Sequence, residues 1–125
     1  MRGINNPEKV SILTEALGGK VLDQIELFEA DVENQQQVDK AVQGACYVVH
    51  LASPVPYKEP NKEESEKVVK TAVEGALSVL RAAAKFGVKR VVMTSSIAAV
   101  RDLFPKDRLP TGTPYTEEHW SDIEF

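Results

Sequence analysis

The sequence is poor in the residues on which several protein classes depend. It has a single cysteine, Cys46, among 125 residues, which excludes a disulfide framework and predicts a core thiol in a protein from a reducing compartment. Its two histidines and one cysteine are Cys46, His50 and His119, and these three residues give no metal-binding signature. Acidic residues outnumber basic ones by 19 to 15, and the net charge of −4 argues against nucleic acid as the main partner.

Long apolar runs are also missing. No stretch approaches the roughly 18 apolar residues of a membrane-spanning helix, and the first residues, MRGINNPEK, lack the apolar core of a signal peptide. We therefore predict no membrane association and a cytoplasmic location. With an ordinary 42% of hydrophobic residues, the chain is predicted to form one domain over residues 1–125.

What the sequence does contain is an alternation of helix and strand patterns. Asn-Pro and Gly-Gly pairs delimit a first helix, and Asn34 followed by Gln37 resembles a capping box that begins another. The predicted order is a helix from Asn6 to Gly18, a strand at Ile25–Ala30, a helix from Asn34 to Gly44, a strand at Cys46–Leu51, a helix from Asn61 to Phe86 and a strand at Arg90–Thr94. Since the strands are almost continuously apolar, they indicate an α/β fold whose parallel sheet is covered on both faces.

The long helix from Asn61 to Phe86 contains an internal glycine. Its apolar residues recur at three- and four-residue spacing, at Val69, Val73, Ala76, Leu77, Leu80, Ala83 and Ala84. Gly75 lies among them, at a cost of about 1 kcal/mol relative to alanine. Either a neighbouring segment packs closely against Gly75, or the glycine is a tolerated defect.

Two hydroxyl residues, Ser95 and Ser96, follow the predicted strand Arg90–Thr94. In open α/β sheets, ligands lie beyond the carboxyl ends of the strands. This pair of serines therefore stands where chemistry is expected. The alternative is that the serines only lead the chain out of the strand and cap nothing, because Ser and Thr are common in loops.

Several segments together resemble one enzyme family. Val49–Pro54 reads VHLASP and Val88–Val100 reads VKRVVMTSSIAAV, while Glu29–Asp31, Ala72–Gly75 and Glu117–Asp122 match in the same order. By these motifs the chain resembles the extended short-chain dehydrogenase/reductases of the NAD-dependent epimerase/dehydratase superfamily, in the branch of dihydroflavonol and cinnamoyl-CoA reductases. The resemblance covers nearly the whole chain and implies a partial Rossmann-like, doubly wound parallel sheet.

The resemblance also implies a nicotinamide cofactor, NADP or NAD, and a small ketone or aldehyde as substrate. Ser96 would be the catalytic residue, donating a hydrogen bond to the carbonyl oxygen as hydride arrives. The residues that would contact the cofactor are Asp31, Val32, Leu51, Ala52, Ser53, Thr94 and Ser95. Helix capping is an open alternative for Asp31, and a plain exit from the strand is one for Ala52 and Ser53. His50 is interpreted as a hydrogen-bonded core histidine rather than a catalytic group.

The chain departs from the family pattern at two places. The first strand and glycine-rich loop have no match, and no Tyr-x-x-x-Lys motif follows Glu117–Asp122. Tyr115-x-x-x-His119 only imitates that motif, because its basic residue is not lysine. We therefore expect an incomplete segment of an NAD(P)H-dependent oxidoreductase, inactive alone. The alternative is a non-catalytic dinucleotide-binding or sensor module of the same fold.

Overall fold

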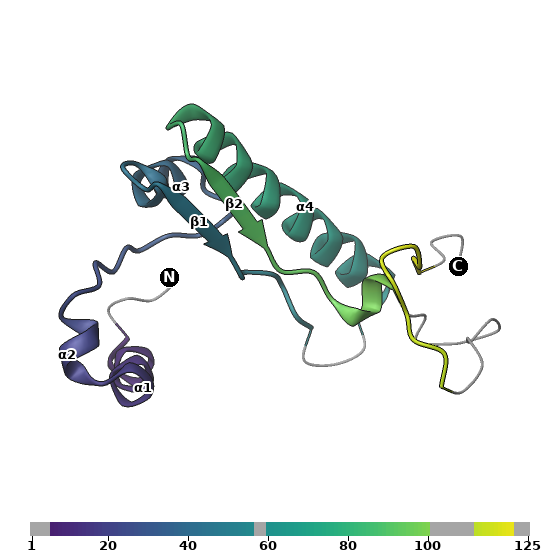
Figure 1. Cartoon of the computed structure of the whole chain (residues 1–125), viewed down its shortest axis with the longest axis horizontal. Coiled ribbons are helices and arrows are strands. Elements are labelled where there is room, and N and C mark those ends of the chain that lie inside the picture. The colour runs from purple at the N-terminus through teal and green to yellow at the C-terminus, as the bar shows by residue number, and fades with distance from the viewer. Residues whose placement is uncertain (1–5, 57–59, 101–111, 122–125) are drawn as a thin grey trace. The chain divides into compact units, whose positions relative to one another are not determined.

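The structure is a computed structural model that describes residues 6–56, 60–100 and 112–121 (Figure 1). Its elements are α1 (Pro7–Leu17), α2 (Gly19–Leu22), α3 (Gln35–Val42), β1 (Tyr47–His50), α4 (Lys62–Lys85), β2 (Arg90–Met93) and the 3-10 helix η1 (Ile97–Ala99). The chain divides into two compact units between Val92 and Met93. That residues 1–125 form one domain stays a prediction.

The predicted first helix is confirmed as α1. The Asn6 side chain accepts a hydrogen bond from the Glu8 N–H at 2.9 Å, and Pro7 begins the first turn. The helix ends at Gly18, whose φ of 76° lies in the region that favours glycine. The short helix α2, which the sequence pattern does not predict, follows at once and contacts α1. Neither helix contains a buried residue.

The predicted strand at Ile25–Ala30 is wrong. These residues form no strand, and the sheet in the described part of the chain consists of β1 and β2 alone. A strand requires a neighbour with which its N–H and C=O groups can pair. No such neighbour lies beside this segment among the described residues. An apolar pattern records the tendency of side chains to be buried, but not the presence of a pairing partner.

β1 and β2 lie side by side and point in the same direction (Figure 1). Since α4 connects them, the three elements form a β–α–β crossover, and the predicted parallel pairing is confirmed. The Lys89 N–H donates to the Cys46 carbonyl at 2.9 Å, which extends the pairing to the residues before both strands. Cys46 itself is exposed. Its predicted place in the core is wrong, because it precedes β1 rather than lying within the packed part of the strand.

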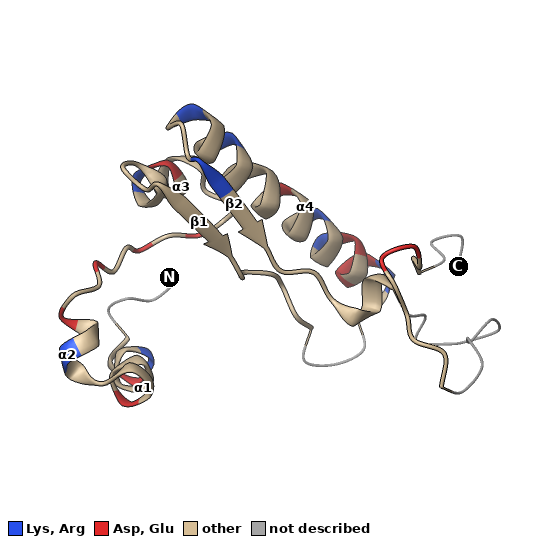
Figure 2. Ribbon diagram, in the orientation of Figure 1, with Lys and Arg blue, Asp and Glu red and all other residues tan. Residues whose placement is uncertain are grey.

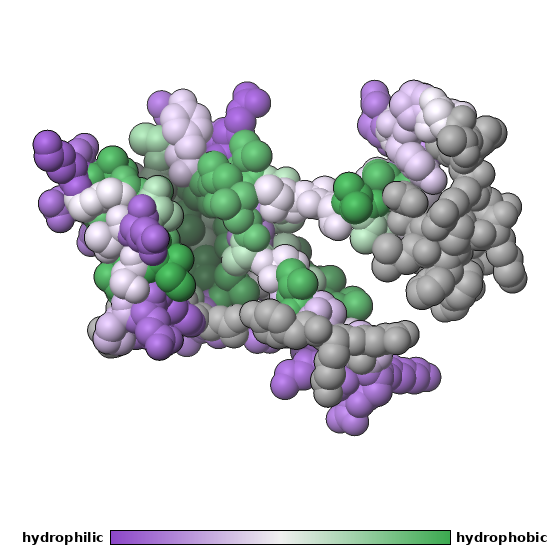
Figure 3. All heavy atoms as spheres, turned by 90° about the horizontal axis from the view of Figure 1, so that it is seen from below, coloured by the Kyte–Doolittle hydropathy of each residue, from purple (hydrophilic) through white to green (hydrophobic). Residues whose placement is uncertain are grey.

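The core lies between α3, α4 and one face of the sheet. Its buried cluster and the side chains packed against it are Val38, Val42, Val79 and Ala82, with Val48, Phe86 and Val88 around them. On the other face, Tyr47, Val49 and Val92 are 66%, 64% and 52% exposed, and Figure 3 shows hydrophobic side chains open at the surface. Within the described residues, the predicted cover on both faces is therefore wrong, because no described element packs over Tyr47 and Val49.

α4 begins with a complete capping box. The Asn61 side chain accepts from the Glu64 N–H, and the Glu64 carboxylate accepts from the Asn61 N–H, each at 2.9 Å. At Asn34 only half of the predicted box forms. Asn34 accepts from the Gln37 N–H at 3.2 Å, while the Gln37 side chain accepts from the Asp31 N–H instead. The Gln37 half of the box at Asn34 is thus replaced by a contact with Asp31.

The face of α4 that packs against the core is not the face that its apolar sequence pattern indicates. The larger apolar residues of that pattern are mostly exposed, with Val69 at 62% and Leu80 at 43%. The buried residues are mostly smaller, namely Gly75, Ser78, Ala82 and Ala83, together with Val79. A Cβ atom added to Gly75 would lie 2.8 Å from Val32 Cγ2. Close packing, not a tolerated defect, therefore explains the glycine.

In the first unit, β1 carries no charged residue, and Lys, Arg, Asp and Glu lie mainly on the helices (Figure 2). Two of these charged side chains connect α3 with α4. Lys85 Nζ of α4 forms an ion pair with the Asp39 carboxylate of α3. The Gln35 side chain donates to that carboxylate at 2.9 Å and to the Ser78 carbonyl at 2.9 Å. One polar network therefore crosses the interface between the two helices.

The second unit contains η1 and residues 112–121. Ser121 links them, because its N–H donates to the Ala99 carbonyl at 3.0 Å and its Oγ donates to the Ala98 carbonyl. The sequence also predicts a loop after Val100, where proline and glycine recur, and its residues 101–111 lie outside the described residues. Among the helices described in both units, none combines the length and apolar character needed to cross a membrane.

Candidate functional site

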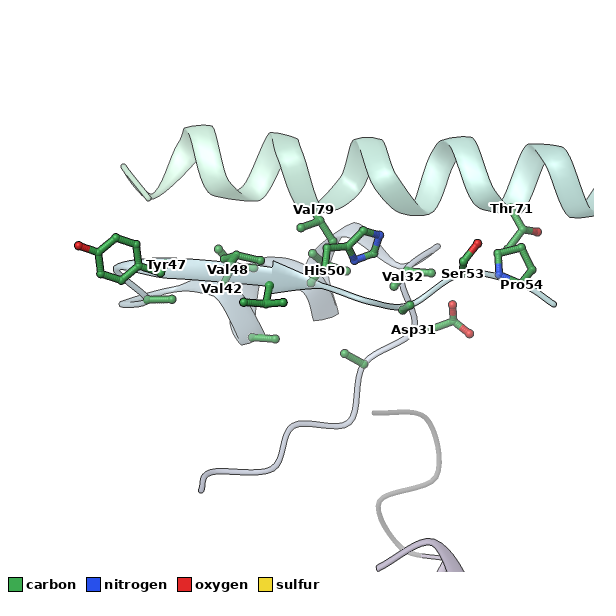
Figure 4. A pocket seen from close by; sticks show the side chains of 16 residues that line it. Asp31, Val32, Val42, Tyr47, Val48, His50, Ser53, Pro54, Thr71 and Val79 are labelled. Carbon is green, nitrogen blue, oxygen red and sulfur yellow. The ribbon is translucent and has the colours of Figure 1, made fainter. Parts of the chain in front are cut away.

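A pocket of about 520 Å³ opens along β1 in the first unit (Figure 4). Its walls come from residues 30–32, α3, β1 and the residues that follow β1. Asp31, Ser53 and Thr71 provide polar groups at the carboxyl end of β1, whereas Val42 and Tyr47 line the opposite end (Figure 4). The pocket thus has an apolar floor along the strand and a polar mouth where the strand ends.

The pocket brings together four residues that the family resemblance assigns to a cofactor, namely Asp31, Val32, Ala52 and Ser53. Asp31 and Val32 precede α3, while Ala52 and Ser53 follow β1. Leu51 does not line the pocket and is 65% exposed.

The Asp31 carboxylate is held in a tight turn. Its Oδ1 accepts from the Glu33 N–H at 3.1 Å, and its backbone carbonyl accepts from the Asn34 N–H at 2.9 Å. Its own N–H donates to the Gln37 side chain at 2.8 Å. The N-cap of α3 is Asn34, so the helix-capping alternative for Asp31 is wrong. A carboxylate has about four lone-pair sites, so Asp31 can accept further hydrogen bonds at the pocket mouth.

Two further lining residues, Thr71 and His50, were not predicted as site residues. Thr71 of α4 donates from Oγ1 to Glu33 Oε1 at 3.1 Å, a contact across 38 residues that no local sequence pattern indicates. His50 is 8% exposed, and its ring lies on the α4 side of β1 (Figure 4). No buried side-chain nitrogen or oxygen in the described residues lacks a hydrogen-bond partner. His50 therefore fits its interpretation as a hydrogen-bonded core histidine.

In the second unit, Ser96 is the N-cap of η1. Its Oγ accepts a hydrogen bond from the Ala98 N–H at 3.2 Å. The alternative that the serines cap nothing is therefore wrong for Ser96. This bond occupies a lone pair of the hydroxyl and leaves its proton available for donation. Thr94 and Ser95 are exposed after the carboxyl end of β2. That they share a site with Ala52 and Ser53 stays a prediction.

Tyr115 and His119 form a local turn. The Thr116 N–H donates to His119 Nδ1 at 3.0 Å. The Tyr115 and His119 rings contact edge to face, with their centroids 5.5 Å apart. One imidazole nitrogen is thus committed to a backbone contact, and the pair is given no catalytic role. Across residues 6–56, 60–100 and 112–121, no three His, Cys, Asp or Glu side chains come close enough to hold a metal ion.

Comparison with known proteins gives a consistent result. The chain is 30% identical to anthocyanidin reductase of Arabidopsis thaliana, 33% identical to dihydroflavonol 4-reductase of Callistephus chinensis and 38% identical to cinnamoyl-CoA reductase 1 of Arabidopsis thaliana. Each match covers 98% of this chain but 35%, 32% and 33% of the respective relative. The chain therefore spans about a third of the length of the curated relatives it matches.

These names confirm the resemblance to dihydroflavonol and cinnamoyl-CoA reductases that the sequence motifs indicate. The sequence profile of one family, described as the 3-beta hydroxysteroid dehydrogenase/isomerase family, matches residues 10–123. The match includes all segments that line the pocket and both serines after β2. The chain belongs to the 3-beta hydroxysteroid dehydrogenase/isomerase family.

Proposed function

We propose that this chain serves in an NAD(P)H-dependent oxidoreductase that reduces a ketone or aldehyde, and that its pocket receives the adenosine end of the cofactor. One observation carries the proposal. Asp31 and the Ala52-Ser53 pair come from separate segments but line one pocket at the carboxyl end of a parallel strand, where ligands of open α/β sheets bind. Family membership and the reductase names of the relatives support it.

The chemistry of the pocket mouth fits adenosine. The Asp31 carboxylate can accept hydrogen bonds from the exocyclic amine of adenine while it also accepts from the Glu33 N–H. The small side chain of Ala52 lets a ribose or phosphate approach the backbone, and the Ser53 hydroxyl can donate to it or accept from it. The cavity of about 520 Å³ falls within the roughly 300–1,000 Å³ typical of small-molecule sites.

We extend the proposal to the fold. The β1–α4–β2 crossover would form part of a Rossmann-like, doubly wound sheet. The sequence contains no match to the first strand and glycine-rich loop of such a sheet. The open face at Tyr47 and Val49 supports this, because doubly wound sheets carry helices on both faces. The pyrophosphate would then be held by backbone N–H groups that the described pocket does not supply.

Ser96 would act on the substrate. When bound, the nicotinamide supplies hydride to the carbonyl carbon, and the carbonyl oxygen gains negative charge. The Ser96 hydroxyl would donate a hydrogen bond to that oxygen. Its cap bond from the Ala98 N–H suits the role, because this bond fixes Oγ and leaves the proton free to donate. Thr94 and Ser95 would lie near the nicotinamide. The choice between NADP and NAD is left to experiment.

Binding of both cofactors tests the proposal. We expect NADPH or NADH to shift backbone amide resonances of Asp31, Ala52 and Ser53 in the isotope-labelled chain. The Asp31→Asn variant should bind about tenfold or more weakly, since a hydrogen bond to a charged group is worth roughly 1.5–3 kcal/mol. The matched control is Asp23→Asn, at the exposed end of α2, which should bind like the wild type. Equal affinity of Asp31→Asn and the wild type would overturn the adenosine site.

Turnover separates the oxidoreductase from the alternative of a nucleotide-binding or sensor module. The sequence holds no Tyr-x-x-x-Lys motif as a proton donor, and general acid catalysis is typically worth about 10²–10⁴ in rate. We therefore expect weak binding and no reductase activity from these 125 residues alone. Binding without turnover in a longer form that carries such a motif would favour the sensor module.

A further inference from the structure

Three residues on one face of α4 contact the turn that carries Asp31. Thr71, Gly75 and Ser78 follow each other at four- and three-residue spacing, which places them on one side of a helix. Each meets a residue of the segment between Asp31 and α3. None of the three is among the residues that the resemblance assigns to catalysis or to the cofactor, although Gly75 ends the matching segment Ala72–Gly75.

At Gly75 the turn packs directly on the helix backbone. Gly75 is buried, and an added Cβ would lie 2.8 Å from Val32 Cγ2 and 3.2 Å from Val32 Cβ. Real Cβ atoms essentially never approach another atom as closely as the first of these distances. Val32, and the Asp31 residue bonded to it, can therefore lie this near the helix only because position 75 has no side chain.

At Ser78 the helix holds the same turn by a hydrogen bond. Ser78 is 4% exposed, and its Oγ donates to the Val32 carbonyl and also lies 2.9 Å from the Gly75 carbonyl. The Ser78 backbone carbonyl accepts from Gln35 Nε2 at 2.9 Å. Bonds to buried groups are costly to lose, because the remaining partner stays unsatisfied. Ser78 thus fixes both the turn and the start of α3.

We infer that Gly75 and Ser78 are positioning residues, which set the depth of the Asp31 turn and thereby place the Asp31 carboxylate for adenine. The inference rests on the proposed adenosine site. Two constraints act on the carboxylate together. The Glu33 N–H holds Oδ1 within the turn, and α4 holds the turn itself through Val32. Removal of either α4 contact lets the turn move while leaving Asp31 in the sequence.

A purely structural role for Ser78 would lower stability without changing which base is preferred. The preference for AMP over IMP distinguishes this structural role from a positioning role. IMP carries a carbonyl oxygen where AMP has the exocyclic amine, so a well-placed carboxylate accepts a hydrogen bond from AMP that IMP cannot donate. A structural defect weakens both ligands equally, whereas a displaced Asp31 weakens AMP alone.

The experiment measures AMP and IMP affinities of the whole chain by titration of its amide resonances. We expect Ser78→Ala to bind AMP about tenfold more weakly, with IMP affinity unchanged and faster hydrogen exchange at the Glu33 amide. Ser78→Cys adds no heavy atom and keeps a weaker donor, so it should restore part of the preference. The matched control is Ser65→Ala, which removes a hydroxyl of α4 bonded only to the Asn61 carbonyl at 2.9 Å, and it should behave as wild type.

Two further variants, Gly75→Ala and the double variant Gly75→Ala/Val32→Ala, test the same inference if Ser78→Ala does not fold. Gly75→Ala should also lose the preference for AMP, and Val32→Ala added to it should restore part of that preference. If the wild type binds AMP and IMP alike, the adenosine site is wrong and the inference fails with it. If the wild type prefers AMP, and both α4 variants keep that preference, the adenosine site stands and the positioning role is overturned.

Discussion

Lys85 Nζ and the Asp39 carboxylate form an ion pair that ties the last turn of α4 to α3. The Asp39 side chain is 18% exposed, and the Gln35 side chain donates to it as well. The hydrogen bond from Lys85, followed by that from Gln35, lowers the pKa of Asp39 below its ordinary value, while desolvation opposes this shift. The charged form of Asp39 is therefore favoured in the folded protein.

The first prediction is a loss of stability in acid through this carboxylate. Because the folded-state pKa of Asp39 lies below its unfolded-state value, its stabilising effect is complete above the unfolded-state pKa and disappears as pH falls through the folded-state pKa. Asp39→Asn should lower the urea midpoint at neutral pH, and its difference from wild type should shrink in acid. Glu74→Gln is the control, because Glu74 and its partner Arg81 are 49% and 58% exposed at 3.4 Å. A difference that stays constant with pH would contradict the prediction.

The second prediction compares three asparagine caps. Asn6, Asn34 and Asn61 each accept a hydrogen bond from a backbone N–H at the start of a helix. Replacement of such a cap by alanine typically costs about 0.5–2 kcal/mol. We expect Asn34→Ala and Asn61→Ala to lower the free energy of unfolding by this amount, because α3 and α4 form the core.

Asn6→Ala should reduce helix content in α1 without moving the main unfolding transition, since α1 contains no buried residue. Circular dichroism at 222 nm and urea titration separate the two effects. A shift of the main transition by Asn6→Ala as large as that by Asn61→Ala would contradict the expected independence of α1.

The third prediction concerns the sign of the effect of Gly75→Ala on stability. In an open helix this change would stabilise by about 1 kcal/mol. Here we expect destabilisation, because the new Cβ meets Val32. Adding Val32→Ala should recover part of the loss in a double-mutant cycle. Gly19→Ala, where nothing lies within 4 Å of the added Cβ, should not destabilise. A stabilising Gly75→Ala would show that the Val32 turn moves freely.

The fourth prediction follows from the proposed roles of the serines. In a form of the protein that reduces a carbonyl substrate, Ser96→Ala should lower kcat by about 10²–10³, the effect of removing one oxyanion donor. Ser95→Ala is the matched control and should have a smaller effect. Steady-state kinetics with both variants decides between them. Equal effects, or a larger effect of Ser95→Ala, would mean that the roles are assigned to the wrong serine.

The fifth prediction is that the isolated chain associates through its open sheet face. Val49 is 64% exposed on that face, whereas Val48 packs against the core. We expect Val49→Lys to reduce light scattering at high concentration, because charge on an exposed strand opposes edge and face pairing. Val48→Lys should unfold the chain instead, since it buries an unpaired charge. A sharp thermal transition in a monomeric wild type would count against this prediction.

Local chemistry explains what could be predicted from the sequence. Helix starts at Asn6 and Asn61 and the stop at Gly18 depend on residues within one turn, so their patterns are reliable. The strand at Ile25–Ala30 depends on a partner strand, which a local pattern cannot reveal. The motifs name Asp31 and Ser53, and the structure places both at one pocket. That they bind a cofactor stays a prediction.

Thr71 and Ser78 could not be found in the same way, because their contacts with Glu33 and Val32 cross about forty residues of sequence. The packed face of α4 was missed for a related reason. Hydrophobicity points to Val69 and Leu80, but the close approach of Val32 selects a face with small side chains. Size, which hydrophobic periodicity does not report, determines the packing there.

The small side chains on the buried face of α4 have a consequence for sequence variation. Gly75, Ser78, Ala82 and Ala83 are all buried. In a saturation scan, fitness at these four positions should fall with each heavy atom added, almost regardless of polarity, because interiors are packed to crystal density. At Val69 and Leu80 the same scan should follow charge rather than size. Substitutions would then be limited by size on the buried side of α4 and by charge on the exposed side. The buried side, which has the smallest residues, would tolerate the fewest substitutions.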